Sequence, residues 1–245
     1  MSALSPAASS TTENVDAYRY PGLQGLFPAE RRLFARWIRP QSRVLDIGCG
    51  LGRVAHVLAE SGHAVVACDL NAAPLPELRR AAMARIAFPV LRCDGRDLPF
   101  APRAFNAVLF PANGIDYINP DSERRRCLAD MARCLAPDGV LLFSTHNPVG
   151  TVFSPRGLAS WNSWRFRARY VLTGGMRGTH FTDPSGLWLA QKTPAAVARE
   201  VEAATGLALL EIVPRSGLPM GQLGATLLSC YPHYVFGPPG RTVVA

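Results

Sequence analysis

The stretch VLDIGCGLGRV, residues 44–54, runs an apolar segment of strand length into an acid and then into glycines at positions 48, 50 and 52. Glycine inside ordered structure costs about 0.5–1 kcal/mol relative to alanine, so three glycines together indicate a need for bare backbone. Two needs fit this pattern. The chain either turns tightly from a strand into a helix, or holds a ligand directly against its main chain.

The segments around this stretch alternate between strand and helix patterns. Strands are expected at 43–47, 64–69, 89–94, 105–110, 139–145, 207–213 and near 226–236, and helices at 29–38, 51–61, 74–87, 121–136 and 193–205. Several of the strands are nearly continuous apolar runs, which is typical of sheets covered by helices on both faces. The pattern predicts an α/β fold with a Rossmann-like, doubly wound, mostly parallel seven-stranded sheet.

We expect one domain with a tail and an insert. Residues 1–15 are small and polar and lack the apolar stretch of a signal peptide, so they are expected to form a disordered tail. Residues 16–245 make up the single domain. Within it, residues 147–190 break the alternation and interleave aromatic residues with arginines, and so long an irregular stretch is typical of a functional element. The segment 147–190 is therefore predicted to be a substrate cap.

Composition narrows the class of protein. The chain of 245 residues is 48% apolar, enough for a sizeable core, but has no uninterrupted run of 18 apolar residues that would span a membrane. Its six cysteines show no CxxC pairing, which favours buried thiols in a reducing, cytoplasmic compartment. These observations predict a cytoplasmic protein that uses neither the membrane nor a metal ion.

The net charge of +8 raises the question of nucleic-acid binding. All basic residues except Lys192 are arginine, which indicates a composition bias, and the arginines are scattered along the chain. The cluster Arg124–Arg126 lies in an expected helix and is predicted to form its solvated face. We therefore treat nucleic acid as a minor alternative.

The spacing of acids after the glycines indicates which ligand they serve. The dinucleotide fingerprint GxGxxG would need glycine at position 53, where the chain has arginine. Asp69 ends the next strand, where an acid accepts hydrogen bonds from ribose hydroxyls, and Asp94 ends the one after, where it would accept from an adenine amine. The carboxyl ends of such strands meet at one edge of the sheet, so these sites predict a shared adenosine-binding crevice.

With these residues in place, the chain resembles the class I S-adenosylmethionine-dependent methyltransferases. VLDIGCGLGR resembles their first motif, VVACDLN the acidic motif of the second strand, and RCDGRDLPF that of the third. FNAVLFPANGIDYI and RCLAPDGVLLFS resemble the motifs of the fourth and fifth strands. Five motifs in order are far more specific than one alone. The resemblance covers residues 43–146 closely and 193–236 loosely.

The resemblance implies S-adenosyl-L-methionine as the cofactor and assigns roles around it. It places Gly48 and Gly50 against the methionine part, with Asp46 beneath the turn, Asp69 on the ribose and Leu70 on the adenine. It places Asp94 on the adenine amine with the backbone of Gly95 and Arg96, and the Pro111 carbonyl near the methionine amino group. The full predicted set is Tyr18, Asp46, Gly48, Cys49, Gly50, Asp69, Leu70, Asp94, Gly95, Arg96 and Pro111.

Methyl transfer needs a nucleophile held in line with the departing bond, and an oxygen acceptor also profits from a base. At the ends of strands four and five we expect His146 to act as base or acceptor-orienting group and Asn113 as a polar anchor. Asp116 is expected only to pack at a helix entry. The predicted substrate-binding residues are Tyr117, Asn147, Trp161, Trp164 and His180.

The sequence therefore predicts methyl transfer to oxygen or nitrogen of a small molecule, in specialised metabolism, by a protein for which a homodimer stays an open alternative. RNA or protein as the acceptor is a second hypothesis. A third keeps the cofactor but transfers its aminocarboxypropyl group or cyclises it, because a fold does not fix its chemistry. A binding protein without catalysis is the fourth.

Overall fold

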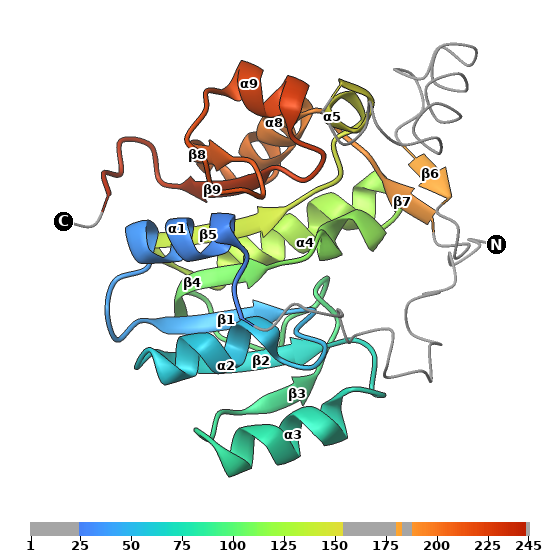
Figure 1. The fold of residues 1–245 in the computed structure, drawn as a ribbon. Helices are drawn as coiled ribbons and strands as arrows, with labels where there is room; N and C mark the ends of the chain where they lie inside the picture. The colour runs from blue at the N-terminus through green and yellow to red at the C-terminus, as the bar shows by residue number, and fades with distance from the viewer. Residues whose placement is uncertain (1–24, 154–179, 183–187, 244–245) are drawn as a thin grey trace.

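The computed structural model describes residues 25–153, 180–182 and 188–243 (Figure 1). A seven-stranded sheet forms its centre, with strand order β3-β2-β1-β4-β5-β9-β8. All neighbouring strands are parallel except β9, which runs antiparallel to both β5 and β8. The predicted doubly wound, mostly parallel sheet is confirmed.

The strands are β1 (Arg43–Ile47), β2 (Ala64–Asp69), β3 (Val90–Arg92), β4 (Phe105–Phe110), β5 (Leu135–Ser144), β8 (Ala208–Val213) and β9 (His233–Gly237). A separate antiparallel pair is formed by β6 (His180–Thr182) and β7 (Trp188–Ala190). The helices are α1 (Pro28–Trp37), α2 (Arg53–Glu60), α3 (Leu75–Ala84), α4 (Asp121–Arg133), α5 (Pro148–Phe153), α8 (Pro194–Thr205) and α9 (Gln222–Leu228), with a 3-10 turn, η3, at Gly114–Tyr117.

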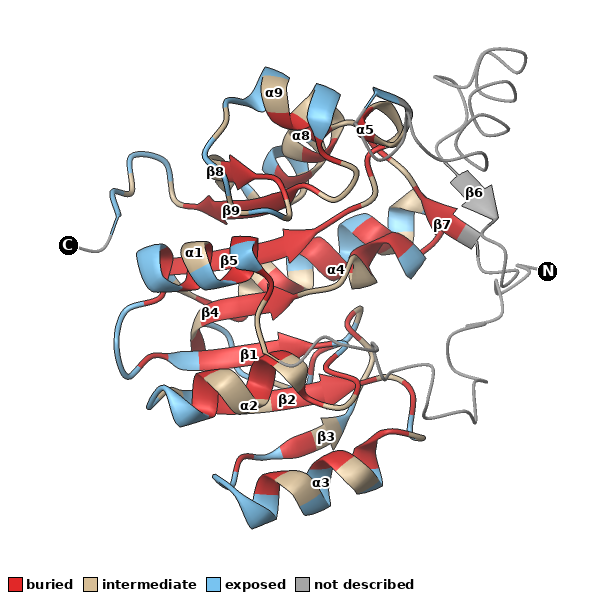
Figure 2. Cartoon of the chain, in the orientation of Figure 1, coloured by how far each residue is buried: buried red, intermediate tan, exposed pale blue. Residues whose placement is uncertain are grey.

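Two apolar cores lie on opposite faces of the sheet, which is why β1, β4 and β5 are buried along nearly their whole length (Figure 2). Helices α1, α2 and α3 pack on one face, and α4, α8 and α9 on the other. Because side chains alternate along a strand, Val44 faces the first core and Leu45 the second. This double burial explains the continuous apolar strands of the sequence.

The last segment corrects one sequence expectation. Residues 226–236 were expected to form a strand, but 226–228 end α9 and the strand starts only at His233. A short apolar run fits a helix as well as a strand, and here Ala225 is buried while Leu223 and Leu227 face outward. Strand β5 also starts earlier than expected, because Leu135 pairs with Phe105 ahead of an irregularity in the ladder.

The cluster Arg124–Arg126 corrects a second expectation from the sequence. Arg124 was expected on the solvated face of its helix, yet it is fully buried, while its neighbours Arg125 and Arg126 are exposed. Helical periodicity places Arg124 on the same side as Cys127, Leu128 and Met131, which belong to the core. All six cysteines are free thiols. No helix in the described part of the chain is long and apolar enough to cross a membrane.

Candidate active site

The order in which the chain adds strands to the sheet reverses between β1 and β4. Ligands of open α/β sheets bind at the carboxyl ends of the strands where such a reversal occurs. The glycine turn follows β1, and residues 111–117 follow β4 directly beside it. Asp69 ends β2, and Asp94 and His146 follow β3 and β5 at the same edge. The topology thus brings the motifs that the sequence singled out to one edge of the sheet.

The glycine turn has the bare, left-handed backbone that its sequence suggested. Gly48, Gly50 and Gly52 have φ angles of 64°, 53° and 77°, a region that side-chain-bearing residues rarely adopt. A Cβ atom on Gly48 would lie 2.7 Å from Cε2 of Phe110. The Cys49 amide donates to the Cys68 carbonyl at 3.0 Å, which ties the turn to β2. All three glycines therefore serve the turn, and Gly48 also leaves its main chain exposed.

We expect Gly48→Ala to lower the free energy of unfolding by about 2–4 kcal/mol, because it adds a left-handed alanine and a collision with Phe110. Gly62→Ala is the matched control. Gly62 has φ 86° but nothing within 4 Å of an added Cβ, so only the backbone cost of about 1 kcal/mol remains. Urea unfolding of both variants measures the difference. Equal losses would show that contact with Phe110 is unimportant.

Asp46 lies under the turn and is fully buried. Neither of its carboxyl oxygens has a hydrogen-bond partner within the described residues. Burial raises the pKa of this carboxyl to about 7, and the nearby Arg53 charge opposes the rise. A buried acceptor without a partner is costly, so this position suits a donor or cation supplied by a ligand.

The raised pKa predicts how stability depends on pH. Between the ordinary pKa of 3.8 and about 7 the folded protein keeps a proton on Asp46 that the unfolded chain releases, so this carboxyl makes stability fall as pH rises through that range. Asp46→Asn removes this dependence. From about pH 4 to about pH 8, the wild type should lose roughly 2–4 kcal/mol of unfolding free energy relative to Asp46→Asn.

Urea unfolding of the cofactor-free protein at several pH values measures this effect. Glu202 provides the control, because Glu202→Gln removes an exposed carboxyl on α8 and its unfolding free energy should run parallel to that of the wild type. A constant difference between wild type and Asp46→Asn across the range would contradict the raised pKa.

Arg53, which replaces the third glycine of the dinucleotide fingerprint, fixes the turn to helix α1. Its guanidinium forms a two-pronged ion pair with Glu30, with distances of 2.6 and 2.7 Å, and Glu30 is only 2% exposed. The Glu30 carboxylate also accepts the Phe27 amide at 2.8 Å. Sequence reasoning treated Arg53 only as a departure from a motif and did not find this brace.

Asp69, the last residue of β2, binds the glycine turn through its side chain. Its Oδ2 accepts the Gly50 amide at 2.9 Å and its Oδ1 accepts the Asn71 amide at 2.9 Å. The side chain is 8% exposed, and its burial raises its pKa while the amide bonds oppose the rise. Leu70 follows, partly exposed, with its carbonyl bound by Arg92. Asp69 therefore couples the end of β2 to the glycine turn.

Asp94 is held by its neighbour Arg96. The Arg96 amide and Nε each donate to Oδ1 at 2.9 Å, and Nη2 donates to Oδ2 at 2.5 Å. This pairing lowers the pKa of Asp94. Arg96 also contacts Glu123 of α4 at 3.3 Å. Gly95 lies between the pair, where an added Cβ would be 3.3 Å from Sγ of Cys127.

The turn after β4 contains Pro111 and Asn113. The Pro111 carbonyl accepts the Gly114 amide at 3.2 Å, and the Asn113 amide donates to Oγ of Ser144 at 3.0 Å. Ala112 and Asn113 have φ angles of 54° and 61°, so this turn carries backbone strain. Oδ1 of Asn113 is buried and has no hydrogen-bond partner among the described residues. It is a second unpaired acceptor at this edge.

His146 pairs with Asp116, the residue expected only to pack. The His146 amide donates a hydrogen bond to Oδ2 of Asp116 at 2.6 Å. Nδ1 of His146 lies 2.9 Å from the same oxygen. An ionised carboxylate only accepts, so Nδ1 carries the proton and Nε2 is left with its lone pair. The His146 side chain is 19% exposed, whereas Asp116 is 1% exposed. The pair has the geometry of a histidine base oriented by a buried acid.

Behind this pair lies a buried chain of charges. Nη1 of Arg124 contacts Oδ1 of Asp116 at 2.8 Å, and its Nε contacts Glu200 of α8 at 3.1 Å. Lys192 then bonds Glu200 at 2.7 Å. A buried carboxylate needs such partners to stay charged. Arg124 thereby keeps Asp116 available to orient His146, a role that its place in an arginine cluster did not suggest.

The predicted substrate residues lie in different surroundings. Asn147 is fully buried, and its Nδ2 donates to the carbonyls of Thr226 and Ser229 at 2.7 and 2.8 Å. Its amide group is thus committed to holding α9 against the end of β5, and it has no donor left for a substrate. Tyr117 is 38% exposed on η3. His180 starts β6, while Tyr18, Trp161 and Trp164 lie outside the described residues.

Part of the chain matches a known protein domain. Residues 44–139 match the family model of a methyltransferase domain. The probable tRNA methyltransferase 9B of Mus musculus is 33% identical over 133 residues, which cover 54% of this chain and 28% of that protein. The chain spans about half or less of the length of several curated relatives that it matches.

Solved structures show the same fold. The methyltransferase CcbJ of Streptomyces caelestis superposes with a TM-score of 0.67 at 17% identity, covering 91% of this chain and 95% of that one. The 1,6-didemethyltoxoflavin N1-methyltransferase of Burkholderia thailandensis, solved with its substrate and S-adenosylhomocysteine, gives 0.58 at 22% identity, covering 85% and 76%. Residues 44–139, which begin in β1 and include the glycine turn, thus match a methyltransferase domain, and the chain shares its fold with methyltransferases of known structure.

Proposed function

We propose that the protein transfers a methyl group from S-adenosylmethionine to an oxygen or nitrogen atom of a small molecule, with His146 as the base. The observation that carries this proposal is the Asp116–His146 pair, which lies at the same sheet edge as the glycine turn and Asp69. A histidine that is oriented through Nδ1 and keeps a lone pair on Nε2 is built to accept a proton.

The residues at this edge fit the cofactor. Gly48 and Gly50 would receive the methionine part on bare backbone, and the unpaired oxygens of Asp46 and Asn113 would accept from its ammonium group. When bound, the cofactor supplies a methyl group on a positively charged sulfur. Cys49, the Pro111 carbonyl and Tyr18 complete the proposed contacts on this side.

Asp69 and Leu70 would bind the ribose and pack on the adenine. An ionised carboxylate has about four acceptor sites, and Asp69 uses two of them for Gly50 and Asn71. Asp94 would accept the adenine amine beside the Gly95 and Arg96 backbone. Because Arg96 already contacts both oxygens of Asp94, that contact requires Arg96 to share the carboxylate.

The reaction then depends on placing the acceptor. An attacking atom must lie about 3–3.5 Å from the methyl carbon and in line with the departing bond. Nε2 of His146 would take the proton from an acceptor hydroxyl or amine, and Asp116 would stabilise the imidazolium that forms. Asn113 would anchor the acceptor or the cofactor through Oδ1, while Tyr117, Trp161, Trp164 and His180 are proposed to contact the acceptor.

A small-molecule acceptor is supported by two observations. The toxoflavin enzyme, which shares the fold, is named for methylation of a small heterocycle. The only base candidate built into this edge in the described part of the chain, His146, is itself 19% exposed, so it can reach an acceptor at the sheet edge. A role in specialised metabolism, a cytoplasmic location and a homodimer are further parts of this proposal.

RNA is the second candidate, favoured by the mouse relative's name and by the net charge of +8. Binding to RNA would weaken steeply with salt, because each neutralised phosphate releases counterions. Filter binding of total tRNA at increasing salt separates the two candidates. A steep slope and methylated tRNA favour RNA, whereas weak, flat binding favours a small acceptor.

Product analysis tests the reaction itself. The protein is incubated with S-adenosylmethionine and a panel of phenols, carboxylic acids and amines, and the products are identified by mass spectrometry. S-adenosylhomocysteine together with an acceptor heavier by one methylene supports methyl transfer. Methylthioadenosine would instead indicate aminocarboxypropyl transfer or cyclisation and would overturn the proposal.

A further inference from the structure

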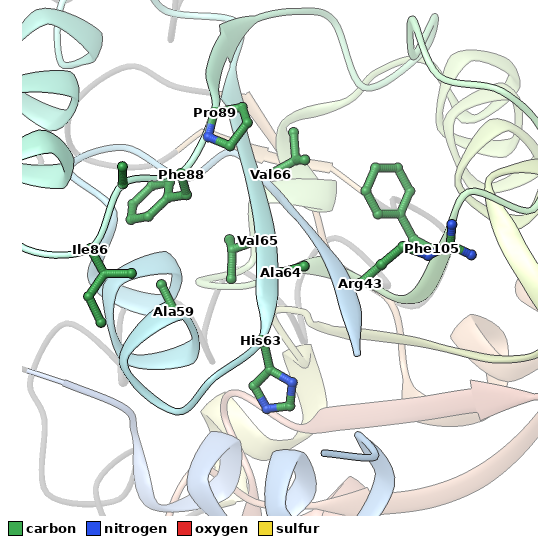
Figure 3. A pocket seen from close by; sticks show the side chains of 11 residues that line it. Arg43, Ala59, His63, Ala64, Val65, Val66, Ile86, Phe88, Pro89 and Phe105 are labelled. Carbon is green, nitrogen blue, oxygen red and sulfur yellow. The ribbon is translucent and has the colours of Figure 1, made fainter. Parts of the chain in front are cut away.

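A pocket lies at the amino ends of the strands, at the opposite edge of the sheet from the proposed active site (Figure 3). Its volume is about 340 Å³, which is in the range of small-molecule sites. We name it the amino-edge pocket. Its lining consists of Arg43, Ala59, His63, Ala64, Val65, Val66, Ile86, Ala87, Phe88, Pro89 and Phe105.

The pocket surrounds a free edge of strand β2. Strand β3 pairs with β2 only from Ala67 onward. Figure 3 shows Val65 and Phe88 on one side of β2, and Val66 and Phe105 on the other. The pocket therefore offers apolar walls on both faces of the sheet, with an open strand edge between them.

The backbone of Val65 faces this opening. The Ala64 amide bonds Ser42 on the β1 side, and the Ala67 amide bonds Pro89 on the β3 side. Because successive residues of a strand point their N–H and C=O groups to opposite sides, those of Val65 point toward β3. Continuing the β2–β3 register, the residue that would donate to the Val65 carbonyl is Pro89, which has no N–H. Nothing that the structure describes pairs with these two groups of Val65, although Val65 is 4% exposed.

The polar groups of the pocket are mostly donors. The guanidinium of Arg43 has no hydrogen bond or ion pair to any described residue, and only the Arg43 amide is bound, by Asn106. Nδ1 of His63 accepts the Ser42 amide at 3.2 Å, so Nε2 carries the proton in the neutral ring. No acidic residue lines the pocket. A positive, donor-rich rim beside apolar walls complements a ligand with a negative charge and an apolar body.

We propose that the amino-edge pocket binds a small amphipathic carboxylate, with its apolar body against Val66 and Phe105 and its acid group toward Arg43, which lie on the same side of β2 (Figure 3). The site is separate from the catalytic edge and does not depend on the proposed methyl transfer. It would give the protein a second small-molecule site at the opposite ends of the same strands.

The test uses 4-phenylbutyrate as the probe and its neutral amide, 4-phenylbutyramide, as the charge control. Saturation-transfer NMR measures binding to the full chain. Two variants at exposed positions change the pocket: Arg43→Gln removes the charge, and Ala64→Leu fills the space. Arg80→Gln, on the exposed side of α3, is the matched control outside the pocket.

We expect the acid to bind about tenfold or more tightly than the amide, because a hydrogen bond to a charged group is worth more than a neutral one. Arg43→Gln should lower the affinity for the acid to that for the amide. Ala64→Leu should abolish binding of both compounds, and Arg80→Gln should leave both affinities unchanged. S-adenosylhomocysteine should not displace the probe. The proposal is overturned if the acid does not bind, if both pocket variants bind it normally, or if S-adenosylhomocysteine displaces it.

Discussion

Asp69→Ala is expected to raise the Kd for S-adenosylmethionine about 100-fold or more. The change removes the acceptor proposed for the ribose hydroxyls, and hydrogen bonds to a charged group are worth about 1.5–3 kcal/mol each. It also releases the Gly50 amide, which Asp69 now holds at 2.9 Å, so the glycine turn loses its link to β2. Isothermal titration with S-adenosylmethionine measures the loss.

Two variants separate these effects. Asp69→Asn keeps an acceptor oxygen for one amide and should retain more affinity than Asp69→Ala, and Asp138→Ala, at an exposed site, should bind like the wild type. Thermal unfolding without the cofactor shows whether each variant is folded. Equal affinity of folded Asp69→Ala and wild type would remove the proposed adenosine site from this edge.

The fold was predictable because its signals are local. Strands covered on both faces are nearly continuous in apolar residues, and proline and glycine mark several helix ends, as Pro194 and Gly206 do for α8. The expectation was wrong at 226–228, where a short apolar run ends a helix whose outward side chains are themselves leucines. Periodicity carries no information there, because both faces of that helix are apolar.

The layout of the candidate site was predictable only where topology alone brings residues together. Asp46, Asp69 and Asp94 end neighbouring parallel strands, so their shared edge follows from the strand order. The partner of each side chain does not follow. Asp116 and His146 meet across 30 positions of sequence, and Asn147, one residue further, points away to bind α9. Arg124 is buried because its helical phase, and not its charge, decides which face it occupies.

The Asp116–His146 pair carries the second large prediction. We expect His146→Gln to lower kcat by about 10²–10⁴-fold with the acceptor identified by the product analysis, which is the usual contribution of a general base. Glutamine is polar and of similar length, but it cannot take up the proton. The Kd for S-adenosylmethionine should be unchanged, because no cofactor contact is proposed for this side chain. Initial rates and isothermal titration measure the two quantities separately.

The pH profile distinguishes a base from a side chain that only fills space. With a histidine base the rate falls as acid protonates the ring, and His146→Gln should lose this dependence together with its activity. His56→Gln, on helix α2, changes a ring that packs against Phe88 and is proposed to contact neither cofactor nor acceptor, so it should keep the wild-type rate and profile. If His146→Gln instead retained the wild-type kcat and its fall at low pH, positioning of the two substrates alone would carry the reaction, and the buried charges behind Asp116 would serve only the packing of α4 against α8.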